Sequence, residues 1–296
     1  MPAFVRMIVF NADAATSIAR QRGLFAAQGV EVEVAVTPNS TAQMRGLGAG
    51  KYDIASTAFD NVLAWSGREK AEMIAVAQAA AAILLPVYVR PEIRDWSDLR
   101  RKPLAVDAVD TAYALVLRRI LLTQGLDLRN NDYELVPTGA TAHRLASMKR
   151  GETFAAILNP PWDQEAEAAG MVRFGDHRAA LPDYPGGVLA VARAWAEKEP
   201  ELLVRFLRAW ESAAAWARRV ENRAEAIRLI AADQSLSSSA AAGRLANLPP
   251  TSELNLRGLE TVLKLRVEFG FSPPLGTDLS RFYDQQYLSR ALAAKP

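Results

Sequence analysis

Short polar side chains are concentrated in six segments of the chain, each placed between a strand-like apolar run and a helix-like run. The segments cover residues 11–14, 37–41, 56–61, 109–111, 138–141 and 159–162. Their hydroxyl, amide and carboxylate groups form hydrogen bonds, and the start of a helix leaves backbone N–H groups without partners inside the helix. Groups of this kind at this position predict contacts to a small ligand.

We expect aromatic side chains to add flat surfaces to these polar groups. Trp162 follows two prolines at an expected helix start, where a planar ligand can stack on it, and Phe59 and Tyr184 offer the same kind of surface. The expected ligand-binding residues are Asn11, Asp13, Asn39, Ser40, Thr41, Thr57, Phe59, Asp110, Thr111, Thr138, Thr141, Asn159, Trp162 and Tyr184.

Four of these residues also have a purely structural interpretation. Asp13, Ser40, Asp110 and Thr141 are of the types that cap helix N-termini, where each contributes about 1 kcal/mol of stability. A residue that caps a helix can also contact a ligand, so both interpretations stand.

The charge of the ligand is open at this point. Several helix starts in one place favour a carboxylate, a sulfonate or another electron-rich group. The six segments contain no lysine or arginine, and carboxylates stand at or beside them at Asp13, Asp60, Asp110 and Asp163. A neutral, zwitterionic or heteroaromatic ligand therefore fits equally well.

Catalytic and metal-binding patterns are not found. The two histidines, His143 and His177, have no metal-ligand spacing, and there is no cysteine. The glycine-rich stretch 46–51 resembles a phosphate loop, but Tyr52 stands where that motif has Ser or Thr. No Gly-x-Ser-x-Gly motif occurs. We expect a protein without catalytic activity, metal or cofactor.

Composition narrows the class of protein further. The 296 residues are half hydrophobic, which suffices for two compact lobes. Basic and acidic residues, 35 and 33, are interspersed, so nucleic acid is not an expected partner. The most apolar stretch, 75–89, is shorter than the roughly 20 residues needed to span a bilayer. It is typical of two buried strands that flank a bend.

Strand-like and helix-like runs alternate along the first two thirds of the chain. In the first part, strands are expected at 4–10, 30–36, 53–56, 73–77 and 83–89, with helices at 13–28, from Ser40 to the glycines at 46–50, and at 60–65. The alternation then restarts, with strands at 104–106, 133–136 and 154–158 and helices at 111–124, 141–149 and 161–168. This order predicts two α/β lobes, each with a mainly parallel sheet. Strict alternation at 30–36 indicates an edge strand.

A strand is expected again at 188–192, and the chain beyond it is almost entirely helical. Apolar side chains recur at helical spacing after Pro200, and Trp210 and Trp216 lie in that helix. We expect both tryptophans to serve packing, and the late helices to pack on the first lobe.

Six blocks in the same order resemble the substrate-binding proteins of nitrate/sulfonate/taurine-type ABC transporters, a family similar to thiamine-pyrimidine-precursor binding proteins. The blocks are 23–34, 48–63, 95–107, 121–126, 149–161 and 258–270. Each block is loose, but together they cover nearly the whole chain.

The resemblance implies the type II periplasmic-binding-protein fold, with two lobes joined by two crossing strands and the ligand in the cleft between them. The crossings are expected near 87–90 and 186–190. Lobe 1 is then 1–88 with 189–296, and lobe 2, inserted, is 89–188. The implied partners are a small organic ligand and the membrane permease of an ABC transporter, and the implied state is a monomer.

The resemblance implies a periplasmic location. The run 1–10 enters a strand without the features of a secretion signal, so the leader is expected to have been removed, with the cytoplasm as the alternative.

Enzymes on the same scaffold are the alternative function. Pyrimidine-precursor synthases resemble these binding proteins but use a cysteine-rich iron motif, which a chain without cysteine lacks. A lyase remains as the enzymatic alternative, and a sensory domain is a third class.

Overall fold

The computed structural model describes residues 2–160 and 162–293. Contacts divide the chain into two compact units. Unit 1 comprises the residues up to Ile83, Pro185–Glu260 and the residues from Ser272 onward, and unit 2 comprises Leu84–Tyr184 and Thr261–Phe271. The sequence-based division places residues 261–271 in lobe 1, whereas their contacts group them with unit 2.

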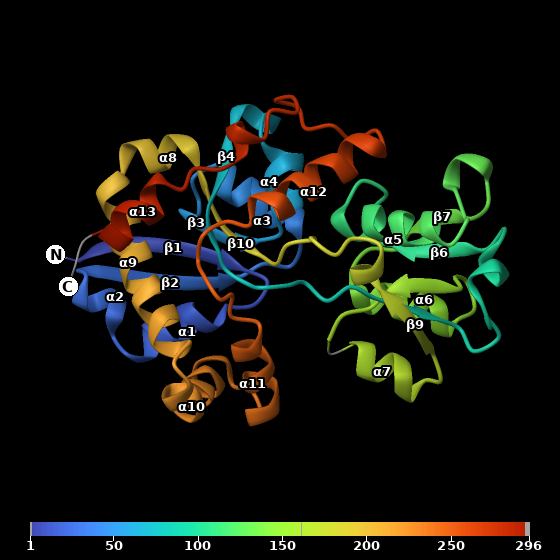
Figure 1. The fold of residues 1–296 in the computed structure, drawn as a ribbon, viewed down its shortest axis with the longest axis horizontal. Coiled ribbons are helices and arrows are strands. Elements are labelled where there is room, and N and C mark those ends of the chain that lie inside the picture. The colour runs from blue at the N-terminus through green and yellow to red at the C-terminus, as the bar shows by residue number, and fades with distance from the viewer. Residues whose placement is uncertain (1, 161, 294–296) are drawn as a thin grey trace. The chain divides into compact units, whose positions relative to one another are not determined.

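Unit 1 is built on a five-stranded sheet with the order β2-β1-β3-β10-β4. The strands are β1 (Ala3–Val9), β2 (Val30–Val36), β3 (Ile54–Thr57), β4 (Met73–Gln78) and β10 (Val188–Ala192). β1 pairs in parallel with β2 and β3, whereas β10, yellow in Figure 1, is antiparallel to β3 and β4. β2 lies at the edge of the sheet, as its alternating sequence predicts.

Helices cover this sheet and include most of the C-terminal part of the chain (Figure 1). They are α1 (Ala14–Gln21), α2 (Leu24–Ala27), α3 (Ser40–Gly48), α4 (Phe59–Trp65), α8 (Arg193–Lys198), α9 (Pro200–Ala217), α10 (Arg223–Gln234), α11 (Ser238–Ala246) and α13 (Gln286–Ala293). Short 3₁₀ helices lie at η1 (Arg68–Lys70), η5 (Val220–Asn222) and η6 (Leu279–Phe282). Helix α12 (Leu256–Glu268) belongs partly to each unit.

The core of unit 1 forms where the apolar faces of sheet and helices meet. Val5 and Met7 of β1, Ile54 of β3 and Leu189 of β10 are buried together with Trp210 of α9. All five side chains are fully inaccessible, so the expected packing role of Trp210 is confirmed.

Unit 2 repeats the same strand pattern in the order β7-β6-β8-β5-β9. The strands are β5 (Pro86–Val89), β6 (Pro103–Val106), β7 (Glu134–Pro137), β8 (Ala155–Ile157) and β9 (Val172–Asp176). The helices are α5 (Ala112–Thr123), α6 (Thr141–Lys149) and α7 (Trp162–Ala168). Short 3₁₀ helices lie at η2 (Trp96–Leu99), η3 (Leu128–Asn130) and η4 (His177–Ala179). Here β5 is the antiparallel strand, between β8 and β9. The predicted α/β class, mainly parallel in each sheet, is confirmed.

One predicted element was wrong, and one strand was missed. The single helix expected at 13–28 is two helices, because Gly23 between α1 and α2 has a φ of 67°, in the left-handed region that ends a helix. Strand β9 was missed because it carries Arg173 and Gly175, which are typical of an edge position rather than of a buried strand.

None of the helices within the described residues is both long enough and apolar enough to cross a membrane.

Candidate ligand-binding site

The carboxyl ends of β1, β2 and β3 share one edge of the sheet in unit 1, because these strands are parallel. Asn11 is exposed just after β1. Thr57 is the last residue of β3 and is buried, and its hydroxyl oxygen accepts a hydrogen bond of 2.9 Å from the Asn61 amide. Edges of this kind are where open α/β sheets hold their ligands.

Helix α3 begins at this edge, one residue earlier than the predicted cap at Ser40 implies. Asn39, and not Ser40, is the N-cap, and its side chain accepts a hydrogen bond of 2.8 Å from the backbone N–H of Ala42. Ser40 is the first helical residue, and Thr41 is exposed. Gln43 closes no capping box, because its amide oxygen accepts no hydrogen bond from the described residues, while its amide nitrogen donates to the carbonyl of Ser56 at 3.0 Å.

Asp13 has the structural role expected of a cap. Its carboxylate accepts hydrogen bonds from the backbone N–H and the hydroxyl of Thr16, at 2.8 and 2.7 Å. It also accepts one of 2.9 Å from the indole N–H of Trp210. Burial raises the pKa of Asp13, and these three donors oppose that rise.

The aromatic surface of this edge differs from the expectation. Phe59 is only 1% exposed and belongs to the core. Phe10 and Val36, at the ends of β1 and β2, are instead 42% and 73% exposed. Phe10 and Val36 are therefore large apolar side chains that a ligand can contact at this edge of the sheet.

Unit 2 presents a matching edge at the carboxyl ends of β6, β7 and β8. Helix α5 is capped by Thr111 and not by Asp110, and the backbone N–H of Ala114 donates to the Thr111 hydroxyl oxygen at 3.4 Å. That hydroxyl in turn donates to Oδ1 of Asp107 at 2.5 Å. Burial raises the pKa of Asp107, and the Thr111 hydroxyl and the charge of Arg144 oppose the rise.

Arg144 of α6 reaches back to this edge and is only 2% exposed. Its guanidinium donates to the carbonyl of Ile157 through Nε and Nη2, at 3.2 and 3.1 Å, and to the carbonyl of Gly139 at 2.9 Å. It also donates to the Thr141 hydroxyl oxygen at 2.8 Å. Thr141 is the first helical residue and forms no cap, because Ala140 occupies the N-cap position.

The remaining predicted residues of unit 2 lie on different segments. The Thr138 hydroxyl donates to the carbonyl of Val106 at 3.3 Å. Trp162 packs against the core cluster that includes Tyr88. Tyr184 is 6% exposed and contacts the ring of His177 edge-on at 5.6 Å. The expected helix start at Pro161 lies outside the described residues.

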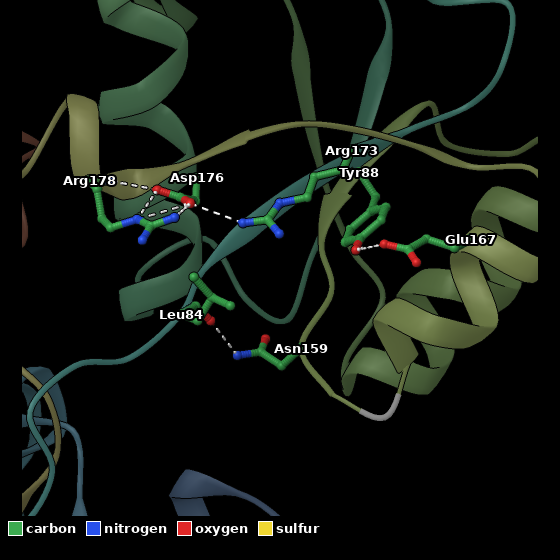
Figure 2. Close-up of polar contacts among 7 residues, drawn as sticks. All are labelled: Leu84, Tyr88, Asn159, Glu167, Arg173, Asp176 and Arg178. Atoms are coloured by element: carbon green, nitrogen blue, oxygen red, sulfur yellow. Dashed lines mark hydrogen bonds and ion pairs between the residues drawn. The ribbon is translucent and has the colours of Figure 1, made fainter. Parts of the chain in front are cut away.

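Figure 2 shows polar contacts that shape this part of unit 2. Asn159, just beyond β8, donates from its side-chain amide to the carbonyl of Leu84 at 2.9 Å. Asp176 at the end of β9 pairs with both Arg173 and Arg178, at 3.0 and 2.5 Å. The hydrogen bond from the Arg178 side chain is the largest cause that holds the pKa of Asp176 well below its usual value.

The structure brings together three residues that sequence reasoning missed. The charge of Arg144 acts on Asp107, and the guanidinium carbon of Arg144 lies 5.0 Å from the ring centre of Tyr113 in α5. Asp107 is the first residue after β6, so its position next to a buried strand was a usable signal. Arg144 lies on the second turn of α6, and no feature of its sequence context indicates that its side chain turns back to the strand ends.

A surface hollow of about 540 Å³ lies elsewhere in unit 2, beside the edge strand β7. Arg101, Tyr133 and Glu134 are among its lining residues, and none of the predicted ligand-binding residues lines it. No group of three or more acidic, cysteine or histidine side chains that could hold a metal occurs within 2–160 and 162–293.

Known structures share this fold. The alkanesulfonate-binding protein SsuA from Xanthomonas axonopodis pv. citri, bound to MOPS, superposes with a TM-score of 0.74 at 17% identity, covering 96% of this chain and 99% of that one. The periplasmic nitrate-binding protein NrtA from Synechocystis PCC 6803 gives 0.75 at 14% identity, covering 98% and 88%. The desulfurization enzyme DSZB gives 0.69 at 18% identity, covering 98% and 99%.

The fold is thus that of the two-lobed periplasmic binding proteins, as the sequence blocks predict. Residues 8–231 match the model of the NMT1-like family, and the chain belongs to that family. No curated protein sequence matches the chain.

Proposed function

We propose that this protein is the solute-binding component of an ABC import system, which binds a small organic ligand and delivers it to a membrane permease. The observation that carries the proposal is the pair of polar edges. In each unit, hydroxyl, amide and carboxylate groups stand at the carboxyl ends of parallel strands, beside capped helix N-termini. Such an edge suits binding, whereas catalysis needs a nucleophile or a proton-transfer pair.

The names of similar structures support the same function. SsuA and NrtA are named for binding alkanesulfonate and nitrate, and both are binding proteins rather than enzymes. We further propose a periplasmic location, a monomeric state, and two lobes of residues 1–88 with 189–296 and residues 89–188. We propose that the predicted residues from Asn11 to Tyr184 contribute the contacts, except Phe59, whose side chain belongs to the core.

The test starts from protein purified without added ligand. Native mass spectrometry identifies any small molecule that stays bound, and that molecule is then incubated with fresh protein. We expect it to return unchanged, because a binding protein stabilises its bound state rather than a transition state. Conversion to a product would contradict the proposal.

Binding should depend on residues of both units. Replacing Thr41 or Thr111 by valine deletes a hydroxyl, and we expect each change to weaken binding, by about tenfold if it removes a contact of about 1.4 kcal/mol. Trp162→Ala removes a planar surface and should have a similar effect. If all three variants bind the recovered ligand as the parent does in calorimetry, the placement of the contacts is wrong.

The second candidate is an enzyme on the same scaffold, which the likeness to DSZB favours. That enzyme has also been solved in complex with biphenyl-2-sulfinic acid, and this structure superposes with a TM-score of 0.67. This chain has no cysteine, so a covalent mechanism would need a different nucleophile. Incubation with biphenyl-2-sulfinic acid, followed by detection of sulfite, separates the two functions.

A further inference from the structure

Two adjoining hollows lie beside β7, at one end of the sheet of unit 2. The first, of about 540 Å³, has an apolar wall made by Val109, Leu128 and Leu135, and Val109 is 41% exposed. The second, of about 520 Å³, shares Arg101 and Asn131 with the first. We call the two hollows together the β7 groove. None of the predicted ligand-binding residues lines it, and each hollow is in the size range of ligand pockets, about 300–1,000 Å³.

Opposite charges line the groove without pairing with each other. Arg101 and Glu134 are both exposed, and within the described chain neither side chain has a hydrogen bond or an ion pair. The other two charged residues of the groove, Arg100 and Asp132, pair with each other. The groove can therefore bind one anionic and one cationic group of an occupant.

The backbone that carries Arg101 is held in one conformation. Its N–H donates to the carbonyl of Asp132 at 2.6 Å, and the neighbouring Arg100 side chain donates to the carbonyl of Gly125 at 3.1 Å. Arg101 has a φ of 58° and Asn131 one of 55°, in the left-handed region that few residues other than glycine adopt. Because such a backbone persists only where its neighbours hold it, the Arg101 side chain starts from a fixed point on the wall of the groove.

The backbone of β7 is unpaired on its outer side. The N–H groups of Glu134 and Thr138 donate to the carbonyls of Lys102 and Val106, at 3.1 and 2.8 Å. Because alternate residues of a parallel strand face the same neighbour, the N–H and C=O of Leu135 face away from β6. β7 is the last strand of its sheet, so no described strand pairs with these groups. An edge of this kind can accept a further strand from another chain.

We propose that the β7 groove binds an extended segment of a partner protein, which adds a strand to β7. An acidic side chain of the segment pairs with Arg101, and a basic side chain pairs with Glu134. An apolar side chain packs against Val109 and Leu128. In strand addition, main-chain hydrogen bonds provide affinity and the side chains select the segment. The groove shares no residue with the predicted ligand-binding set, so this inference does not depend on the proposed function.

A displayed library of random heptapeptides, selected on the full chain, supplies the probes. We expect the enriched peptides to carry an acidic residue, a basic residue and at least one β-branched residue. Synthetic copies should bind Arg101→Glu and Glu134→Arg at least about fivefold more weakly than the parent, because like charges then meet. If no peptide is enriched, or if the enriched peptides bind both variants as tightly as the parent, the inference is wrong.

Exchange of the two charges tests whether the pairing is direct. The double variant with Arg101→Glu and Glu134→Arg should bind about fivefold more tightly a peptide whose acidic and basic residues are also exchanged. Arg94→Glu is the matched control, because Arg94 is an exposed arginine of unit 2 that does not line the groove. An equal loss of affinity in Arg94→Glu and Arg101→Glu, with thermal melts showing folded protein, would indicate attraction to overall charge and contradict the assignment.

Peptides methylated on backbone nitrogen test the strand pairing on the parent protein. One peptide is methylated at alternate positions, and a second at the positions in between. We expect only one of them to lose binding, by about fivefold or more, because alternate N–H groups of an added strand face β7. Leu135→Pro removes the outward N–H of β7 and should weaken binding of the unmethylated peptide in the same way. Equal binding of both methylated peptides would rule out strand addition.

A second copy of this chain is the competing occupant of the groove. Analytical ultracentrifugation of the purified protein should show a monomer in the absence of peptide. A dimer that Arg101→Glu dissociates would overturn the assignment of the groove to a partner protein.

Discussion

The indole N–H of Trp210 donates a hydrogen bond of 2.9 Å to the carboxylate of Asp13, across 197 positions of sequence. The bond joins the N-cap of α1 to the middle of α9, and the Trp210 side chain is completely buried. It ties the first helix of unit 1 to a helix that follows the inserted unit.

Trp210→Ala should therefore destabilise unit 1. We expect a loss of about 3–5 kcal/mol in the free energy of unfolding, from the cavity and the lost hydrogen bond. Trp216→Ala on the same helix is the control, because Trp216 is only partly buried, with Arg22 stacked 4.1 Å from its ring. Urea unfolding measures both, and a smaller loss for Trp210 than for Trp216 would contradict the prediction.

Asp13→Asn tests whether the buried carboxylate is unfavourable when ionised. Because the pKa of Asp13 in the folded protein is raised above its ordinary value of 3.8, the folded state binds more protons and loses stability as pH rises through that window. The variant has no such loss, so its stability relative to the parent should increase from pH 4 to pH 7. Urea unfolding at both values provides the check, and a change in the opposite direction would mean that the three hydrogen bonds outweigh burial.

His177 gives unit 2 a pH dependence of the opposite sign. Its ring is 3% exposed, its Nδ1 has no partner among the described residues, and burial lowers its pKa below the ordinary 6.5. Asp176 raises this pKa and Arg178 lowers it, but burial is the larger effect. The folded state therefore loses stability as pH falls below 6.5, when the unfolded chain takes up the proton.

His177→Phe should remove that loss. Between pH 7.5 and pH 5, the melting temperature of the variant should fall less than that of the parent. His143→Phe is the matched control, because it replaces the other histidine of the chain, which is exposed. Identical profiles for the parent and His177→Phe would show that the buried ring does not titrate in this range.

Gly186 occupies a position where no side chain fits. A Cβ there would lie 2.0 Å from the carbonyl oxygen of Ala80 and 2.7 Å from the backbone nitrogen of Ala82. We expect Gly186→Ala to cost at least about 1–3 kcal/mol, since backbone atoms must move. Gly243→Ala, within α11 and with no atom within 4 Å of the new Cβ, should instead add up to about 1 kcal/mol. Thermal melts of both variants measure the change in stability at each position.

Much of the fold follows from patterns that are local in the sequence. The alternation at 30–36 identifies an edge strand because only one of its faces is buried. The break at Gly23 was missed because apolar residues continue on both sides of it, and β9 was missed because its pairing with β5 depends on residues far away in the chain.

The candidate site was harder to predict from the sequence than the fold. Residue types identify helix starts, but Asn39 and Thr111 are the caps rather than their neighbours Ser40 and Asp110, and this choice depends on backbone angles. Arg144 is three residues beyond the polar segment 138–141, which it contacts at Gly139, and only the folded helix brings its guanidinium there. Phe59 was expected as a ligand surface, but it is in the core.

The position of β10 determines the order in which the two sheets can be completed during synthesis. β10 separates β3 from β4 in the first sheet, yet it leaves the ribosome only after all five strands of the second sheet. The inserted unit can therefore assemble its sheet first, while the edges of β3 and β4 that pair with β10 remain unpaired. A chain that stops before residue 188 would expose those edges to other chains, and such a product should aggregate although most of its sequence is intact.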